Sequence, residues 1–180
     1  MRALEAENKE LREELEYLKT HPTIAAGLRG ERLVLNLLGG RLTEYAASYD
    51  LELSNGTRIE IKYSRLCTPG LNAPDTHRWS WSKVLGFRDK GKDYAYLLLI
   101  GEKDKRYKEQ YLGDAPYVYF LIPRDRVPEI VVKGKLVGSN TNLTTNFRTV
   151  RSVPSKVIIA HMVPPDLVHA LEHASTLDAS

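Results

Sequence analysis

The sequence is poor in cysteine, with Cys67 alone among 180 residues, which excludes a disulfide framework and a zinc cluster held by cysteines. Long hydrophobic runs are missing too, because the longest apolar stretch, residues 94–100, is far too short to cross a bilayer. A large excess of one charge is also absent: 26 Lys and Arg face 23 Asp and Glu, which permits nucleic-acid binding without indicating it. The densely charged first residues predict that no secretory signal is present. We therefore expect a cytoplasmic protein with no membrane partner.

Composition and patterning predict one α/β domain over residues 21–180. A hydrophobic content of 42% and a charged content of 27% are typical of a globular chain. The order helix, three strands, helix, strand, strand indicates a mixed central sheet flanked by helices. Thr23 is expected to cap the first helix, and Gly39-Gly40 to end it. Helices are predicted at 23–38, 79–87, 123–127 and 165–173, and strands at 42–47, 49–53, 58–63, 94–100, 117–122, 130–137 and 156–161.

Residues 1–20 form a separate segment with a seven-residue rhythm. Its inner positions are Leu4, Asn8, Leu11, Leu15 and Leu18. Glutamates at the g positions would face basic residues at the e positions of a parallel partner, and a single Asn at an inner position fixes two strands in register. The pattern predicts a parallel coiled coil, and hence a homodimer through the N-terminal helix. The alternative is a solvated helix that packs along its own domain, because so few heptads are marginal alone.

The most informative stretch is residues 49–62, with the sequence YDLELSNGTRIEIK. Leu51 and Leu53 are spaced by two, as are Ile59 and Ile61, so each pair shares one face of its strand. A three-residue loop, 54–56, with its glycine in the left-handed region, pairs 51 with 59 and 53 with 57. This register puts all four apolar side chains on one face, whereas a two-residue loop would not.

The same register sets Asp50 opposite Glu60 and puts both on one face with Lys62. Neighbouring carboxylates repel unless a cation lies between them. Lys62 supplies one charge, and Mg²⁺ could supply more, since it prefers one or two carboxylates together with water and phosphate oxygens. Such an ion lowers the pKa of bound water, which the lysine could orient or deprotonate. The alternative is a strand pair with a solvated polar face, and the spacing alone leaves both open.

This stretch resembles the PD-(D/E)XK nuclease superfamily, which includes type II restriction endonucleases, archaeal Holliday-junction resolvases and repair nucleases. Asp50 matches the metal-binding aspartate, and Glu60-Ile61-Lys62 matches the (D/E)-X-K element. The helix that contains Glu31 is similar to the first core helix, where many members carry a further acidic residue. The resemblance covers residues 23–127, and the predicted elements at 79–87, 93–100 and 119–127 are similar to the rest of the core. Tyr49 stands where the family name has proline.

The resemblance implies a restriction-endonuclease-like core and hydrolysis of phosphodiester bonds with Mg²⁺, for which Mn²⁺ is an expected substitute. Asp50, Glu60 and the backbone carbonyl of Ile61 would hold the metal, and Lys62 would position the attacking water. Glu31 would bind a second ion or a metal-bound water, unless it is simply a solvated helix residue.

A homodimeric, site-specific enzyme of the type II restriction kind that cuts double-stranded DNA is the favoured interpretation. A junction resolvase and a homing endonuclease with the same core are alternatives. A DNA-binding module with an inactive nuclease fold is a third, although the intact Asp50, Glu60 and Lys62 argue against it.

Basic and amide side chains follow the hairpin along the chain. Residues 61–92 contain seven basic and two acidic residues, and are therefore placed to contact phosphates. The polar stretch 138–148 is expected to be a loop that reads base edges, because Asn and Arg pair with adenine and guanine in the major groove; an ordinary polar loop is the alternative. The residues predicted to contact nucleic acid are Arg65, Arg78, Lys83, Asn140, Asn142, Arg148 and Arg151.

Overall fold

The computed structural model describes residues 9, 12, 13, 16, 21–44, 47–68, 77–86, 91–134 and 138–177. All the inner positions of the expected coiled coil lie outside these residues, so the zipper and the homodimer stay predictions. The four described residues of this segment are helical, and Lys9 pairs with Glu13 at 3.8 Å. No described helix is long and apolar enough to span a membrane.

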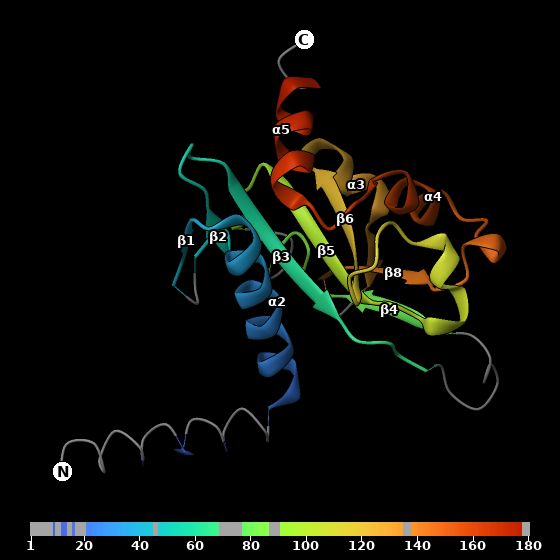
Figure 1. Ribbon diagram of the computed structural model, residues 1–180, viewed down its shortest axis with the longest axis horizontal. Helices are drawn as coiled ribbons and strands as arrows, with labels where there is room; N and C mark the ends of the chain where they lie inside the picture. Colours follow the sequence, from blue (N-terminus) through green and yellow to red (C-terminus); the bar gives the residue numbers. More distant parts are fainter. Residues whose placement is uncertain are drawn as a thin grey trace.

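Helix α2 covers Pro22–Leu38 (Figure 1). It begins at Pro22 with His21 at the N-cap position, so the prediction that Thr23 caps it is wrong. The reason is that proline is favoured at the first helical position, where its missing N–H costs no hydrogen bond. The predicted end is confirmed: Gly39 has a φ of 67°, and its N–H donates to the carbonyl of Leu35.

The main sheet is mixed and has six strands in the order β1-β2-β3-β5-β6-β9. Neighbours β3 and β5 run parallel, and the other neighbouring pairs are antiparallel. The α/β class and the three long strands are confirmed, whereas the strand expected at 42–47 ends at Leu42. The strands are β1 (Arg41–Leu42), β2 (Leu51–Glu52), β3 (Arg58–Ser64), β5 (Tyr96–Glu102), β6 (Tyr117–Pro123) and β9 (Met162–Val163).

The predicted hairpin register is confirmed from the loop to the pairing of Leu51 with Ile59, but Asp50 does not pair with Glu60 as expected, because its N–H donates to the carbonyl of Ile59. Leu51 pairs with Ile59, and the N–H of Leu53 donates to the carbonyl of Thr57 at 2.9 Å. Gly56 closes the three-residue loop with a φ of 82°, in the left-handed region that glycine adopts without strain.

A small sheet, in the order β4-β8-β7, replaces two elements that the sequence pattern mispredicted. Its strands are β4 (Arg78–Trp81), β7 (Val132–Gly134) and β8 (Gly138–Thr144). β4 stands where a helix was expected at 79–87, and β8 where a polar loop was expected. Exposed Arg78 and Ser80 alternate with buried Trp79 and Trp81, which is the two-residue period of a strand. The crossover from β3 to β5 therefore carries a strand instead of the expected core helix.

The other helices whose bounds the structure describes lie in the second half of the chain. Helix α4 covers Val153–Ala160, so the strand expected at 156–161 is wrong; the Ser152 side chain caps this helix by accepting from the N–H of Ser155. Helix α5 covers Leu167–Leu177, where a helix was expected. The others are η2 (Lys105–Gln110), η3 (Arg124–Arg126), α3 (Val127–Ile130) and η4 (Phe147–Thr149).

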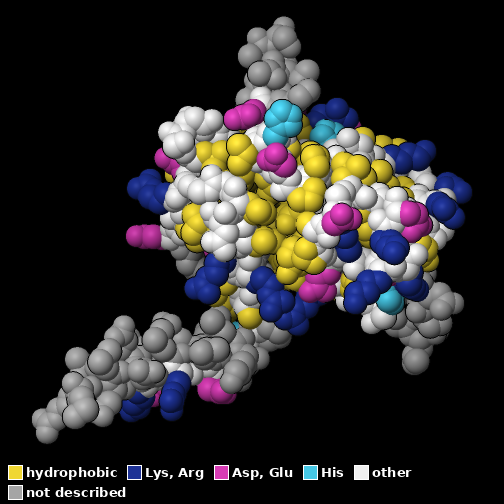
Figure 2. Space-filling view, in the orientation of Figure 1, with side chains coloured by type: hydrophobic (Ala, Val, Ile, Leu, Met, Phe, Trp, Pro, Cys, Tyr) yellow, Lys and Arg dark blue, Asp and Glu magenta, His cyan; other side chains and the backbone are white. Residues whose placement is uncertain are grey.

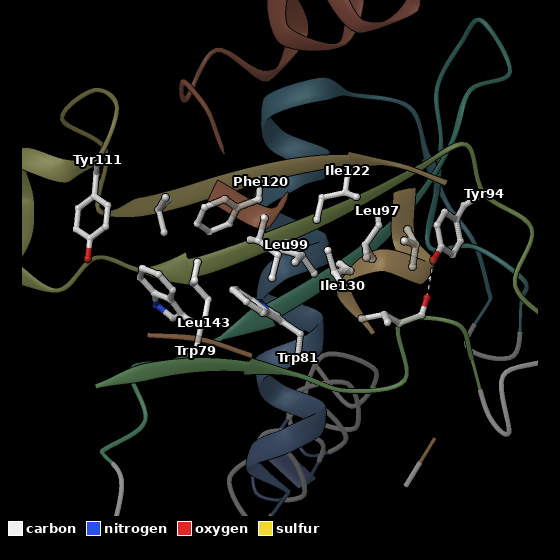
Figure 3. Packing of buried hydrophobic residues seen from close by; sticks show 14 residues of the cluster. Trp79, Trp81, Tyr94, Leu97, Leu99, Tyr111, Phe120, Ile122, Ile130 and Leu143 are labelled. Carbon is white, nitrogen blue, oxygen red and sulfur yellow. Dashed lines mark hydrogen bonds between the residues drawn. The ribbon is translucent and has the colours of Figure 1, made fainter. Parts of the chain in front are cut away.

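Two hydrophobic clusters cover opposite faces of the main sheet. Alternate residues of β5, Tyr96, Leu98 and Ile100, pack in one cluster with residues of α2 and α5. Figure 2 shows apolar side chains gathered over this face between the two helices. Leu97 and Leu99 pack on the other face with residues of the small sheet, α3 and α4 (Figure 3). Because β5 is covered on both faces, its apolar run lacks alternation.

Two tryptophans hold the small sheet to the main sheet. The indole N–H of Trp79 donates to the carbonyl of Glu102 at 2.8 Å, and that of Trp81 donates to the carbonyl of Ile100 at 3.0 Å. Gly101 lies between these two carbonyls, and a Cβ there would stand 2.6 Å from the Trp79 indole nitrogen. The absence of a side chain at Gly101 therefore allows the two layers to touch.

We expect Gly101→Ala to lower the free energy of unfolding by about 1–3 kcal/mol, because the added methyl group overpacks a buried contact. Urea denaturation measures the change. Gly27→Ala is the matched control, since a Cβ at Gly27 meets no atom within 4 Å and alanine favours a helix. Equal stability of the two variants would contradict the packing argument.

Candidate active site

The backbone of Asp50 is held between two strands. Its N–H donates to the carbonyl of Ile59 at 3.0 Å, and its carbonyl accepts from the N–H of Thr43 at 3.0 Å. Its carboxylate oxygen Oδ2 accepts the N–H of Ile61 at 2.7 Å. Asp50 is therefore fixed beside β3 by its own backbone and by its side chain.

Glu60 and Lys62 lie on β3 and complete the predicted cluster. The Lys62 ammonium donates to Glu60 Oε1 and lies 3.9 Å from Asp50 Oδ2. The side chain of Glu60 is 0% exposed, whereas those of Asp50 and Lys62 are 17% and 22% exposed. The structure thus brings Asp50, Glu60 and Lys62 together on one face, as the hairpin register predicted.

A second ammonium, that of Lys92, joins this cluster and was missed as a site residue in the sequence. Lys92 Nζ lies 2.9 Å from Glu60 Oε2 and 3.9 Å from Asp50 Oδ1. Lys92 precedes β5, and the neighbouring Asp93 donates its N–H to the carbonyl of Ser48, so this segment passes beside Asp50. Lys92 could have been located from the parallel pairing of β3 with β5. That pairing depends on the crossover between the two strands, for which the sequence pattern predicted a helix where the structure has β4.

Burial shapes the charges of the acidic groups. Burial raises the pKa of Glu60, although the Lys62 ammonium opposes this effect. Glu60 Oε2 is buried and accepts no hydrogen bond of normal geometry from the described residues, although Lys92 lies beside it. Burial, followed by the negative charge of Asp50, raises the pKa of Glu31 to about 7. Near neutral pH the protonated and ionised forms of Glu31 are therefore both well populated.

A cleft of about 430 Å³ adjoins this cluster, with Glu31, Asp50, Lys62, Lys83 and Lys92 in its wall, whereas the buried Glu60 does not line it. β2 pairs with β3 only through Arg58 and Ile59, which leaves the cleft at an open edge of the sheet. Helix α2 reaches this edge because Gly30 has no side chain: a Cβ there would stand 2.8 Å from the Cβ of Tyr63. Gly30 thereby brings the adjacent Glu31 into the cleft wall.

The donor atoms fit one hard divalent ion better than two. Among the described residues, no three His, Cys, Asp or Glu side chains are grouped closely enough to hold a metal ion, so Glu31 does not complete such a group. Asp50 and Glu60 offer two carboxylates, one with a buried oxygen that lacks a regular hydrogen bond. The Ile61 N–H points to Asp50, and the carbonyl of an extended residue points to the same edge as its N–H. Two carboxylates and a carbonyl suit Mg²⁺, which takes its other oxygens from water and phosphate.

The outward face of the small sheet carries three of the residues predicted to contact nucleic acid. Arg78 lies opposite Thr144, and Ser80 lies opposite Asn142. Asn140 is two residues from Asn142 along β8 and therefore on the same face, while Thr141 between them points inward and is buried. We call this set, Arg78, Ser80, Asn140, Asn142 and Thr144, the outward face.

The other predicted contacts lie at the two ends of the outward face. Asn140 Oδ1 accepts the N–H of Lys83, which lines the cleft, at 3.4 Å. Arg65 lies at the opposite end, where Cys67 pairs with Arg78. Exposed Arg148 and Arg151 follow the end of β8. The outward face therefore extends from Lys83 in the cleft wall to Arg78 and Thr144, the latter followed along the chain by Arg148 and Arg151.

Comparison with protein-family models gave no match, and comparison with curated proteins found none that is significantly similar. The resemblance to the nuclease superfamily therefore depends on the motif and on the site geometry, with a strand in place of the expected crossover helix.

The raised pKa of Glu31 predicts a pH-dependent stability of the metal-free protein. Between pH 4.5 and about 7 the unfolded chain has lost this proton and the folded protein keeps it, so stability should fall as pH rises through this window. Glu31→Gln removes the effect. Relative to the wild type, the variant should gain about 1–2 kcal/mol between pH 5 and pH 8, after allowance for solvent screening. Urea denaturation with a chelator present measures this gain, and parallel pH profiles would contradict it.

Proposed function

We propose that this protein is a Mg²⁺-dependent endonuclease that hydrolyses phosphodiester bonds of double-stranded DNA. The observation that carries the proposal is the convergence of Asp50, Glu60 and Lys62, with Asp50 and Lys62 lining an open cleft and Glu60 buried beside them. Two carboxylates and a lysine within 4 Å are the groups needed to bind a hard cation and to orient a water molecule. A purely solvated polar face would leave Glu60 exposed, whereas it is fully buried.

Each residue has a role that follows from its contacts. Asp50, Glu60 and the Ile61 carbonyl would hold Mg²⁺, which when bound lowers the pKa of a water ligand and stabilises negative charge on phosphate. The Ile61 N–H keeps the Asp50 carboxylate oriented. Lys62, close to both carboxylates, would hold the attacking water and offset the charge that develops on the phosphate. Glu31, with its pKa near 7, could accept a proton from water at neutral pH.

The outward face supports DNA as the substrate. A two-stranded β-ribbon fits the major groove, where Arg and Asn side chains pair with guanine and adenine edges. Arg78 and Asn142 are exposed on adjacent strands of such a ribbon. Lys83 in the cleft and the arginines at the far end would contact the phosphates on either side. A homodimer of the restriction type, cutting both strands, is the form we favour; a resolvase would cut four-way junctions instead.

Asp50→Asn and Lys62→Met should each reduce DNA cleavage by on the order of 10²-fold or more, because each removes a group that contacts the ion or the water. Asparagine can still accept the Ile61 N–H, so the fold should persist. The measurement is cleavage of supercoiled plasmid and of a four-way junction with Mg²⁺, Mn²⁺ or chelator. Asp93→Asn is the matched control, since this exposed aspartate pairs with Arg58 outside the cluster. Wild-type protein that cuts neither substrate with either ion would overturn the proposal.

Residues of the outward face and the arginines that follow β8 should affect DNA binding in two distinct ways. Asn142→Ala should relax preference at one base pair, at about 1–3 kcal/mol, because it removes a contact to a base edge. Arg148→Ala should weaken binding to all sequences, because it removes a phosphate contact. The slope of log affinity against log salt concentration should become shallower by about one. Fluorescence anisotropy with a randomised duplex library at several salt concentrations separates the effects. Arg126→Ala is the control, since this arginine pairs with Glu129; equal effects of all three would place the DNA elsewhere.

A further inference from the structure

Lys92 lies beside the oxygen of the buried Glu60 carboxylate that Lys62 does not contact. The two oxygens of Glu60 are divided between two ammonium groups, Oε1 to Lys62 and Oε2 to Lys92. Lys92 Nζ also lies 3.9 Å from Asp50 Oδ1 and 3.5 Å from the carbonyl of Ala47, the long limit of a hydrogen bond. Its strongest interaction is therefore with Glu60.

The burial of Glu60 explains why this second cation matters. Its side chain is 0% exposed and that of Lys92 is 17% exposed. A buried carboxylate without a counter-charge costs several kcal/mol. Asp50 adds a second negative charge, and the two lysines together balance the pair. The four side chains Asp50, Glu60, Lys62 and Lys92 therefore carry no net charge when no metal ion is bound.

A divalent ion bound to Asp50 and Glu60 would need the place that the Lys92 ammonium takes. Each of the two ammonium groups lies within 4 Å of one oxygen of each carboxylate, and the Lys92 ammonium is the one beside Glu60 Oε2, the oxygen without a regular hydrogen bond. Two cations so close repel strongly in a partly buried site. Lys62 is a poorer competitor, because it lies within β3 and hydrogen-bonds the other oxygen of Glu60.

We propose that Lys92 is an internal counter-ion that competes with the divalent metal ion for Glu60 Oε2. In the metal-free protein its ammonium holds the carboxylates of Glu60 and Asp50 together, and metal binding displaces it into the cleft. This inference rests on the proposed function, since it takes a divalent ion as the ligand of this site. It assigns to Lys92 control of metal affinity, a role separate from the orientation of water by Lys62.

The test uses the full-length protein without DNA. Lys92→Met should bind Mn²⁺ at least fivefold more tightly than the wild type, measured by the loss of the free-ion signal in electron paramagnetic resonance. Lys92→Arg keeps the charge and should bind as the wild type does. Without metal, Lys92→Met should unfold at a lower temperature, and 10 mM Mg²⁺ should raise its melting temperature by more than it raises that of the wild type. If Lys92→Met is insoluble, Lys92→Gln replaces it with the same expected direction.

The matched control is Lys83→Met, which removes an equal charge from the wall of the same cleft. Its Mn²⁺ affinity should change less than that of Lys92→Met. Equal tightening by both variants, or unchanged or weaker binding by Lys92→Met, would overturn the competition. If the wild type cleaves DNA but Lys92→Met binds Mn²⁺ no more tightly than the wild type, this inference is overturned and the nuclease proposal stands. Tighter binding by Lys92→Met with no cleavage by the wild type would do the reverse, and no Mn²⁺ binding by either protein would overturn both.

Discussion

The pairing of Leu51 with Ile59 is the constraint on which the candidate site depends. This register buries the apolar residues of β2 and β3 on one face, and the next position along then brings Asp50 beside β3. A slip by one residue would exchange the two faces and separate Asp50 from Glu60. The burial of hydrophobic side chains thus provides the free energy that holds two carboxylates together against their repulsion.

Because β2 is short, the side chains beside β3 remain accessible from the cleft. Because β2 pairs with only two residues of β3, no described strand covers this sheet edge beyond Ile59, and α2 approaches it where Gly30 permits close contact with Tyr63. Glu31 and Lys92 thereby approach the same cleft from outside the hairpin, as Figure 1 helps to show through the position of α2 across β3. The site is therefore built from three segments that are distant in the sequence.

The small sheet provides the outward face, which lies beside the cleft. Trp79 and Trp81 fix β4 to β5 through their indole N–H groups, and the residues that alternate with them face outward. The same two-residue period that buries the tryptophans therefore exposes Arg78. One strand, β4, therefore both packs the core and exposes polar side chains. The outward face lies next to the cleft, because Asn140 accepts the N–H of Lys83.

The sequence by itself determined the features that depend on neighbours along the chain. The hairpin, its three-residue loop, the long buried strands and the clustering of Asp50, Glu60 and Lys62 follow from spacing, turn chemistry and apolar pattern. Tertiary structure decided the rest. β4 and α4 are short segments whose local pattern fits either a helix or a strand, and packing against β5, β6 and β8 selects the outcome. Lys92 reaches Glu60 only because β5 runs parallel to β3, a long-range pairing for which no local pattern in the chain is a signal.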